Sequence, residues 1–153
     1  MKRILIYIIA LVALHFVPVV GADIGTLHPV EVVLVYKEAD QVVIATDTED
    51  IGKGTDGLSA LENLKATTPG TVYLDTAEYL LIGEDAQDVA EQLRGCLKKS
   101  VKVCKAEKSV KLTDCAQYLS VHGRLPQLKD WKIGDNLPYL QVFEERLLLT
   151  GNS

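Results

Sequence analysis

The sequence contains few of the residues from which metal sites and disulfide frameworks are built. Its 153 residues include three histidines and three cysteines, and no Cys-x-x-Cys pair occurs among Cys96, Cys104 and Cys115. This spacing gives little support to a structural zinc site. We therefore predict no metal and no cofactor. The thiols are expected to be free and buried as small apolar groups, with one disulfide among the three or a reactive thiol as the alternatives.

Positive charge is also scarce. The chain has 16 lysines and arginines against 21 aspartates and glutamates, which gives a formal net charge of −5. Nucleic-acid binding rests on a positive surface that neutralises phosphates, so no nucleic-acid partner is expected. Anionic lipid headgroups are disfavoured for the same reason.

The amino-terminal segment has the order of a secretory signal. Lys2 and Arg3 precede an apolar run over residues 4–20, and the small residues Gly21 and Ala22 follow it. This pattern predicts a signal peptide over residues 1–22 and a single exported globular domain over residues 23–153. An uncleaved membrane anchor is the alternative, because an apolar run of about 17 residues is just long enough to span a bilayer. Asp23 stands where a lipoprotein would carry cysteine, so no lipid anchor is predicted.

The remaining pattern alternates strands and helices. Residues 79–82 are apolar at every position, which is typical of a strand covered on both faces. The predicted elements are a hairpin over 29–48, a loop over 47–55, a helix over 56–66, a strand over 72–82 bent near 75–77, a helix over 85–97, a strand over 101–106, a helix from 112 to 123, a loop over 124–136 and a hairpin over 137–150. The order is strand, strand, helix, strand, helix, strand, helix, strand, strand. It predicts an α/β or α+β fold, a mixed sheet with about three helices packed on it.

Three groups of residues could form a metal or catalytic site, and none of them predicts an enzyme. The acidic loop that begins at Asp47 could offer oxygen ligands to calcium, but its spacing does not fit an EF-hand, so a solvated loop is expected. Asp75 and Glu78 lie three apart on a predicted strand and should point to opposite faces. Cys115 and His122 lie near one helix end, where we expect Cys115 in the core and His122 as a polar helix-end residue.

The carboxy-terminal part carries the candidate protein-contact surface. Trp131 could join the aromatic residues of the last hairpin in a docking surface, or fold back over the sheet as a lid on the core. The hairpin over 137–150 could also offer a strand edge to a partner. The predicted contact residues are Trp131, Tyr139, Leu140, Val142 and Phe143.

Three blocks, taken in order, resemble a known family. The first is Gly52-Lys53-Gly54-Thr55 before a helix, the second is YLDTAEYLLIGE at residues 73–84, and the third is VKVCKAE at residues 101–107. They resemble the N-terminal domain of the Ger(x)C family, the C-type subunits of spore germinant receptors in endospore-forming Firmicutes. The resemblance covers about half of the chain.

The resemblance implies a non-catalytic, accessory protein of the cell or spore envelope. Members of that family are longer lipoproteins of several domains, so this chain resembles a short, single-domain relative. The implied partners are proteins, with the membrane subunits of a germinant receptor as candidates, and the implied location is the outer face of the cytoplasmic membrane or the envelope. The alternative is a small secreted enzyme or ligand-binding protein with a site near the loop 52–57 and Asp75.

Overall fold

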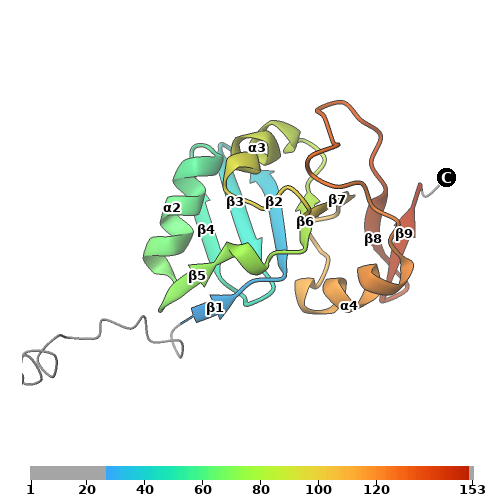
Figure 1. Ribbon diagram of the computed structural model, residues 1–153, viewed down its shortest axis with the longest axis horizontal. Coiled ribbons are helices and arrows are strands. Elements are labelled where there is room, and N and C mark those ends of the chain that lie inside the picture. The colour runs from blue at the N-terminus through green and yellow to red at the C-terminus, as the bar shows by residue number, and fades with distance from the viewer. Residues whose placement is uncertain (1–26, 152–153) are drawn as a thin grey trace, which may run out of the picture.

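The computed structural model describes residues 27–151, so the predicted leader lies outside the described residues. Within them, seven strands form one sheet (Figure 1). Their spatial order is β4 (Ile51–Gly54), β3 (Gln41–Thr46), β2 (Val32–Glu38), β6 (Tyr79–Ile82), β7 (Lys102–Ala106), β8 (Tyr139–Phe143) and β9 (Arg146–Thr150). Two short strands, β1 (Leu27–Pro29) and β5 (Thr71–Tyr73), form a separate parallel pair.

The sheet is mixed, as the sequence predicts. Strands β2, β6, β7 and β8 run parallel to one another, while β3 and β4 at one end and β9 at the other are antiparallel to their neighbours. The described residues add three α-helices, α2 (Gly57–Thr67), α3 (Gln87–Gln92) and α4 (Leu112–His122). The predicted class, a mixed sheet with three helices, is therefore confirmed.

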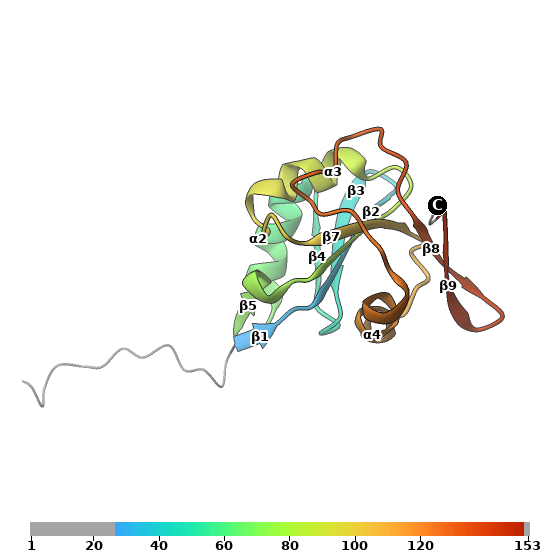
Figure 2. The same cartoon turned by 45° about the vertical axis from the view of Figure 1, so that its right-hand side comes forward.

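Both faces of the central strands are buried, and the core is divided into two clusters. In β6, Leu80 and Ile82 belong to the first cluster, under α2 and α3, whereas Tyr79 and Leu81 belong to the second, under α4. Figure 2 shows α4 on the side of the sheet away from α3. The uninterrupted apolar run of β6 follows from this double covering, because neither face meets water.

Helix α2 lies directly against the edge strand β4, and two glycines make this possible. A β-carbon on Gly52 would overlap the Ala60 carbonyl oxygen and lie 2.6 Å from Cβ of Leu64. A β-carbon on Gly54 would overlap the backbone nitrogen of Ala60 in the same way. The predicted loop over 47–55 is therefore wrong at residues 51–54, which form a strand. Glycine marks the close approach of two backbones here.

Helix α2 begins where its capping residues dictate. The Asp56 carboxylate accepts a hydrogen bond from the Ser59 backbone N–H at 2.8 Å, and the Ser59 hydroxyl oxygen accepts one from the Asp56 N–H at 3.1 Å. This reciprocal pair satisfies amides that have no partner inside the helix. The helix ends at Thr67, two residues before Pro69, since the residue that precedes a proline avoids helical geometry.

Two further elements differ from the prediction. The strand expected over 72–82 is divided by a 3₁₀ turn at Leu74–Thr76, so the predicted bend is present but separates β5 from β6. The helix expected over 85–97 is shorter. Its α-helical part is Gln87–Gln92, and a 3₁₀ turn at Leu93–Gly95 continues it. Its apolar face, including Val89 and Ala90, packs into the first cluster as the periodicity predicts.

Arg94, in the 3₁₀ turn that continues α3, binds the irregular segment 124–136 through hydrogen bonds. Its Nη1 donates to the Leu128 carbonyl at 2.6 Å, and its Nη2 donates to the Trp131 carbonyl at 2.8 Å. The guanidinium also lies 5.3 Å from the centroid of the Trp131 ring and is paired with Glu91 at 2.7 Å. One planar group thus fixes a long loop by two carbonyls and an aromatic face, a geometry that suits arginine and not lysine.

No helix within residues 27–151 is long and apolar enough to cross a membrane.

Replacing Gly52 with alanine should unfold or strongly destabilise the protein. The added β-carbon would overlap the α2 backbone, which cannot move like a flexible side chain, so we expect a loss of about 3 kcal/mol in the free energy of unfolding. Gly95→Ala is the matched control, because a β-carbon there has nothing within 4 Å. Urea denaturation measures both variants. Equal midpoints for the two would contradict the close packing of α2 on β4.

Removing the Arg94 side chain should release the 124–136 segment. Arg94→Ala leaves two backbone carbonyls without their donors, and we expect a loss of about 2 kcal/mol in stability. Trp131 is the only tryptophan, so its fluorescence emission should shift to the red as the loop detaches. Lys99→Ala, a nearby exposed cation, serves as the control and should leave the emission unchanged. An unshifted spectrum for Arg94→Ala would contradict this role.

Candidate functional site

The terminal hairpin β8–β9 is attached to the sheet only at its base. Just two residues of β8, Tyr139 and Leu140, are registered with β7, whereas β8 and β9 pair along five residues. Beyond Leu140 the hairpin extends past the end of β7, and Figure 2 shows it projecting from the body. Figure 1 shows it at the edge of the molecule, next to α4. A two-stranded ribbon of this kind is of marginal stability by itself.

Both faces of this ribbon carry apolar side chains. Residues opposite one another in an antiparallel pair share a face. Val142 lies opposite Leu147, on the face whose base packs into the second core cluster. The other face, which we call the outer hairpin face, consists of Tyr139, Gln141, Phe143, Arg146, Leu148 and Thr150. On it, Phe143 is 59% exposed and Leu148 is 40% exposed.

The predicted contact residues divide into buried and exposed sets. Trp131 is 1% exposed and belongs to the first cluster, so it takes the second of its two predicted roles, a lid on the core. Leu140 is fully buried in the second cluster. Neither side chain can form part of a docking surface. Val142 and Phe143 are exposed and Tyr139 is half-buried, and these three remain as surface residues.

Side chains protect both edges of the sheet. At β4, the Lys53 backbone N–H donates to Oδ1 of Asn63 at 3.0 Å. At β9, the Leu149 backbone N–H donates to the Tyr118 hydroxyl of α4 at 3.1 Å. Unpaired strand edges invite other strands, and these contacts occupy one outward amide at each edge. The predicted strand edge of the hairpin is therefore partly covered. The outer hairpin face is open, whereas the opposite face is partly covered, because Leu147 and Leu149 pack against the second cluster.

The tip of the hairpin holds two residues in the left-handed region. The φ angles of Glu144 and Glu145 are 49° and 62°. A two-residue hairpin turn with positive φ at both positions fits the twist of the strands, and Asn-Gly is the sequence that adopts it most easily. Two glutamates in this conformation store strain, because the left-handed region costs a residue with a β-carbon about 1–2 kcal/mol.

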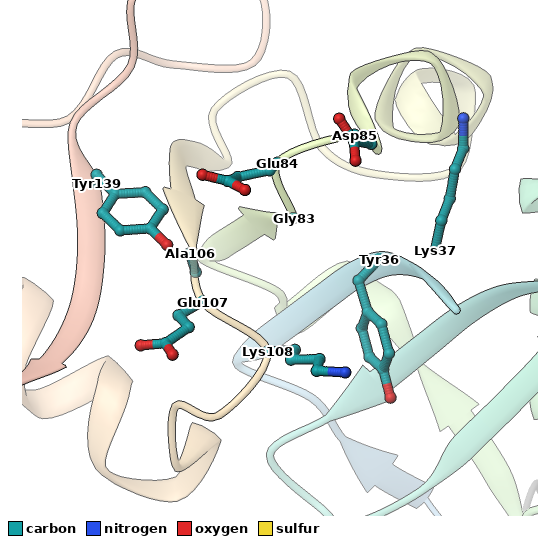
Figure 3. Close-up of a pocket in the computed structure, with 9 residues that line it drawn as sticks. All are labelled: Tyr36, Lys37, Gly83, Glu84, Asp85, Ala106, Glu107, Lys108 and Tyr139. Atoms are coloured by element: carbon teal, nitrogen blue, oxygen red, sulfur yellow. The ribbon is translucent and has the colours of Figure 1, made fainter. Parts of the chain in front are cut away.

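A pocket of about 240 Å³ lies beside the base of the hairpin, at the carboxyl ends of β2, β6 and β7 (Figure 3). Ligands of sheets with parallel strands commonly bind at this end. Its lining includes Glu84 and Asp85 after β6, Glu107 and Lys108 after β7, and Tyr139. Figure 3 shows these side chains arriving from the ends of separate strands.

The pocket is more negative than positive. Lys37 also lines it, but its ammonium group is held by the Asp88 carboxylate of α3 at 2.8 Å. Partial burial raises the pKa of Tyr139, and the nearby carboxylates of Glu84 and Glu107 raise it further. Figure 3 shows the Glu84 carboxylate beside the Tyr139 ring and the Glu107 carboxylate below its hydroxyl group. The pocket is therefore suited to a positively charged group.

The carboxylates of the acidic loop near Asp47 have a structural role, because they accept hydrogen bonds from other residues of the domain. The Asp47 carboxylate accepts hydrogen bonds from the backbone N–H groups of Glu31 and Val32 at the start of β2. The Asp50 carboxylate accepts one from the Thr48 hydroxyl at 2.7 Å and lies 3.7 Å from Nδ1 of His28. In the part of the chain that the structure describes, no group of three or more His, Cys, Asp and Glu side chains could hold a metal ion.

The cysteines are free, as predicted, and burial makes two of the three thiols poor nucleophiles. Cys104 and Cys115 are buried in the second cluster, while Cys96 is half-buried. Burial raises the pKa of the Cys115 thiol to about 12, with smaller contributions from Asp114 and Asp47, and burial also raises the pKa of Cys104. Neither thiol is a thiolate at neutral pH, and the thiolate is the nucleophilic form.

The other candidate catalytic residues have separate surroundings. Asp75 lies in the 3₁₀ turn and Glu78 follows it, and both are exposed. His28 on β1 faces Asp50, whereas His122 ends α4 and stacks on Tyr118. The Cys115 thiol donates to the Lys111 carbonyl at 3.3 Å.

Tyr139 is a pocket residue that the sequence predicted as a contact residue. The acidic pocket residues Glu84, Asp85 and Glu107 were not predicted as part of a site, although a signal for them exists. Glu84 and Asp85 follow, after Gly83, a strand that is apolar at every position, and Glu107 directly follows the next parallel strand. The carboxyl ends of parallel strands meet at one edge of a sheet, so polar residues at those positions gather there. The pairing of β6 with β7, which the sequence alone leaves open, was the missing step.

Relieving the strained turn should stabilise the hairpin. Glu144→Asn combined with Glu145→Gly places the residues that best tolerate positive φ at both turn positions, and we expect a gain of about 1 kcal/mol in the free energy of unfolding. Glu144→Gln with Glu145→Gln removes the same charges and keeps the β-carbons, so it should be close to neutral. Thermal unfolding measures the stability of both double variants relative to the unmodified protein. An equal gain in the two double variants would assign the effect to charge and contradict the strained turn.

Comparison of the chain with models of known protein families, with curated proteins and with solved structures found no match in any of the three. The function is therefore inferred from the residues of this chain.

Proposed function

We propose that this domain is a non-catalytic, exported interaction module that binds another protein through its terminal hairpin. The observation that carries the proposal is the ribbon beyond Leu140, which projects from the body with apolar side chains on both faces. Phe143 and Leu148 on the outer hairpin face and Val142 on the other face are exposed together. Single exposed apolar residues are ordinary, but a group of them on a projecting element is typical of an interaction site.

Covering the hairpin would stabilise both the hairpin and the complex. Complete burial of a leucine or phenylalanine side chain contributes about 1.5–3 kcal/mol, and aromatic anchors dominate interface energetics. The ribbon also has strained Glu144 and Glu145 at its tip and only two residues of pairing with β7. A partner that packs on either face would therefore supply the contacts that a two-stranded ribbon lacks.

Observations around the alternative site favour a non-catalytic role. The glycine-rich segment near residues 52–57 offers no room to a ligand, because the α2 backbone fills the space above Gly52 and Gly54. The buried thiols of Cys104 and Cys115 have raised pKa values and are poor nucleophiles. These points support binding, and not catalysis, as the work of the domain.

We extend the proposal to the cell or spore envelope on the strength of the sequence alone. The leader pattern supports export, and the three blocks that resemble the Ger(x)C family fall on β4 with α2, on the segment from β5 to β6, and on β7. The partner proposed on this basis is a membrane subunit of a germinant receptor. Expression confined to vegetative growth, with no receptor genes nearby, would contradict this narrower proposal and leave the interaction module untouched.

Site-specific photocrosslinking in the producing cells tests the contact surface. A benzophenone amino acid in place of Phe143 or Leu148 should give one discrete covalent adduct, identical at both positions, because both side chains lie on the outer hairpin face. Val121 is the matched control, since it is 74% exposed and apolar but lies on α4. Adducts at position 121 equal to those at 143, or none at 143 and 148, would refute the proposed surface.

A further inference from the structure

We infer that the segment bound by the hairpin is basic as well as apolar: its apolar side chains pack on Phe143 and Leu148, and its cationic side chains face the carboxylates that border them. This inference rests on the proposed function and names the chemistry of the partner. The proposed binding partner is a segment of another protein that combines lysine or arginine with apolar residues.

The apolar part of the surface is a diagonal pair. Phe143 lies opposite Arg146, and Leu148 lies opposite Gln141, so Phe143 and Leu148 are diagonal neighbours on one face. Side chains in this relation are about 7–8 Å apart across the strands, close enough for one aromatic or aliphatic residue of a partner to contact both.

The border of this pair is negative. Glu144 and Glu145 form the turn beside Phe143, and Glu84, Asp85 and Glu107 line the pocket beside the base of the hairpin. None of these five carboxylates belongs to an ion pair among residues 27–151, whereas the pocket lysine Lys37 is neutralised by Asp88. Arg146, Lys108 and Lys105, the register partner of Tyr139 on β7, are opposing cations nearby. The carboxylates outnumber them, so the local excess is negative, like the net charge of the chain.

Tyr139 joins the two parts into one surface. It lines the pocket, and it also belongs to the outer hairpin face, where it precedes Gln141 and Phe143 at alternate positions of β8. A segment lying along β8 would therefore pass from the apolar pair to the pocket without leaving the protein. A tyrosine face beside two carboxylates also attracts a cation, by its quadrupole and by their charge. A second copy of this chain fits less well, because like-charged borders would meet.

A pair of labelled heptapeptides tests the partner chemistry. The probe is Lys-Leu-Lys-Phe-Lys-Leu-Lys, and its counterpart carries glutamate in place of every lysine. Fluorescence anisotropy is measured on the protein in the form that its own cells export. We expect the basic probe to bind at least about tenfold more tightly than the acidic one, with an affinity that falls as salt rises, because exposed charges are screened.

Variants separate the apolar and the ionic contributions. Phe143→Ser with Leu148→Ser should weaken binding of the basic probe about tenfold although every charge remains, whereas Val121→Ser should leave it unchanged. Glu84→Gln with Glu107→Gln should weaken it about fivefold and reduce its salt dependence. Circular dichroism confirms that each variant is folded.

Other outcomes overturn the inference. Equal binding of both peptides, no binding of the basic probe at millimolar concentration, or binding that the serine variants do not alter would each refute it. Self-association of the protein that Phe143→Ser with Leu148→Ser abolishes would make a second copy the occupant. That last result would refute the basic partner and leave the hairpin as a contact surface, whereas photocrosslinking failure at 143 and 148 removes the surface itself.

Discussion

The structure depends on one constraint, which is that the central parallel strands must be covered on both faces. β2 and β6 are apolar at successive positions, so each needs a layer above and a layer below. Helices α2 and α3, with the Trp131 loop fastened by Arg94, supply one layer, and α4 supplies the other. No residue of β8 or β9 belongs to the first cluster, and α4 covers only part of the hairpin, through Leu147, Leu149 and the Tyr118 hydroxyl. The exposed apolar residues of the hairpin lie where this covering stops.

Much of this architecture could be predicted from local patterns. Turn residues marked the first and last hairpins, and the uninterrupted run over 79–82 indicated a doubly covered strand. The prediction failed where a residue type fits two different structural roles. Gly52 and Gly54 were interpreted as loop residues, but they serve close contact between α2 and β4, which only the packed structure reveals. The sequence left a surface and a core role open for Trp131. Its burial in the structure shows the core role, and Arg94, 37 residues earlier, donates to its carbonyl.

The candidate site could be predicted only in part, for a related reason. Val142 and Phe143 are both exposed, although they lie on opposite faces, because they are near the tip of the hairpin. Leu140 shares a face with Val142 but lies at the base, where it is buried in the second cluster, and the sequence does not say how far the covering reaches. Glu84 and Glu107 are neighbours through the parallel pairing of β6 and β7, a long-range relation that neither periodicity nor composition encodes.

The Tyr118 hydroxyl on the Leu149 amide has a consequence for selectivity. Main-chain recognition is indifferent to sequence, so an unprotected outer strand would pair with almost any extended polypeptide. With that amide already occupied by the phenol, an incoming strand would make one backbone hydrogen bond fewer with β9. Its side chains would contribute a larger share of the binding, so binding would depend more on its sequence.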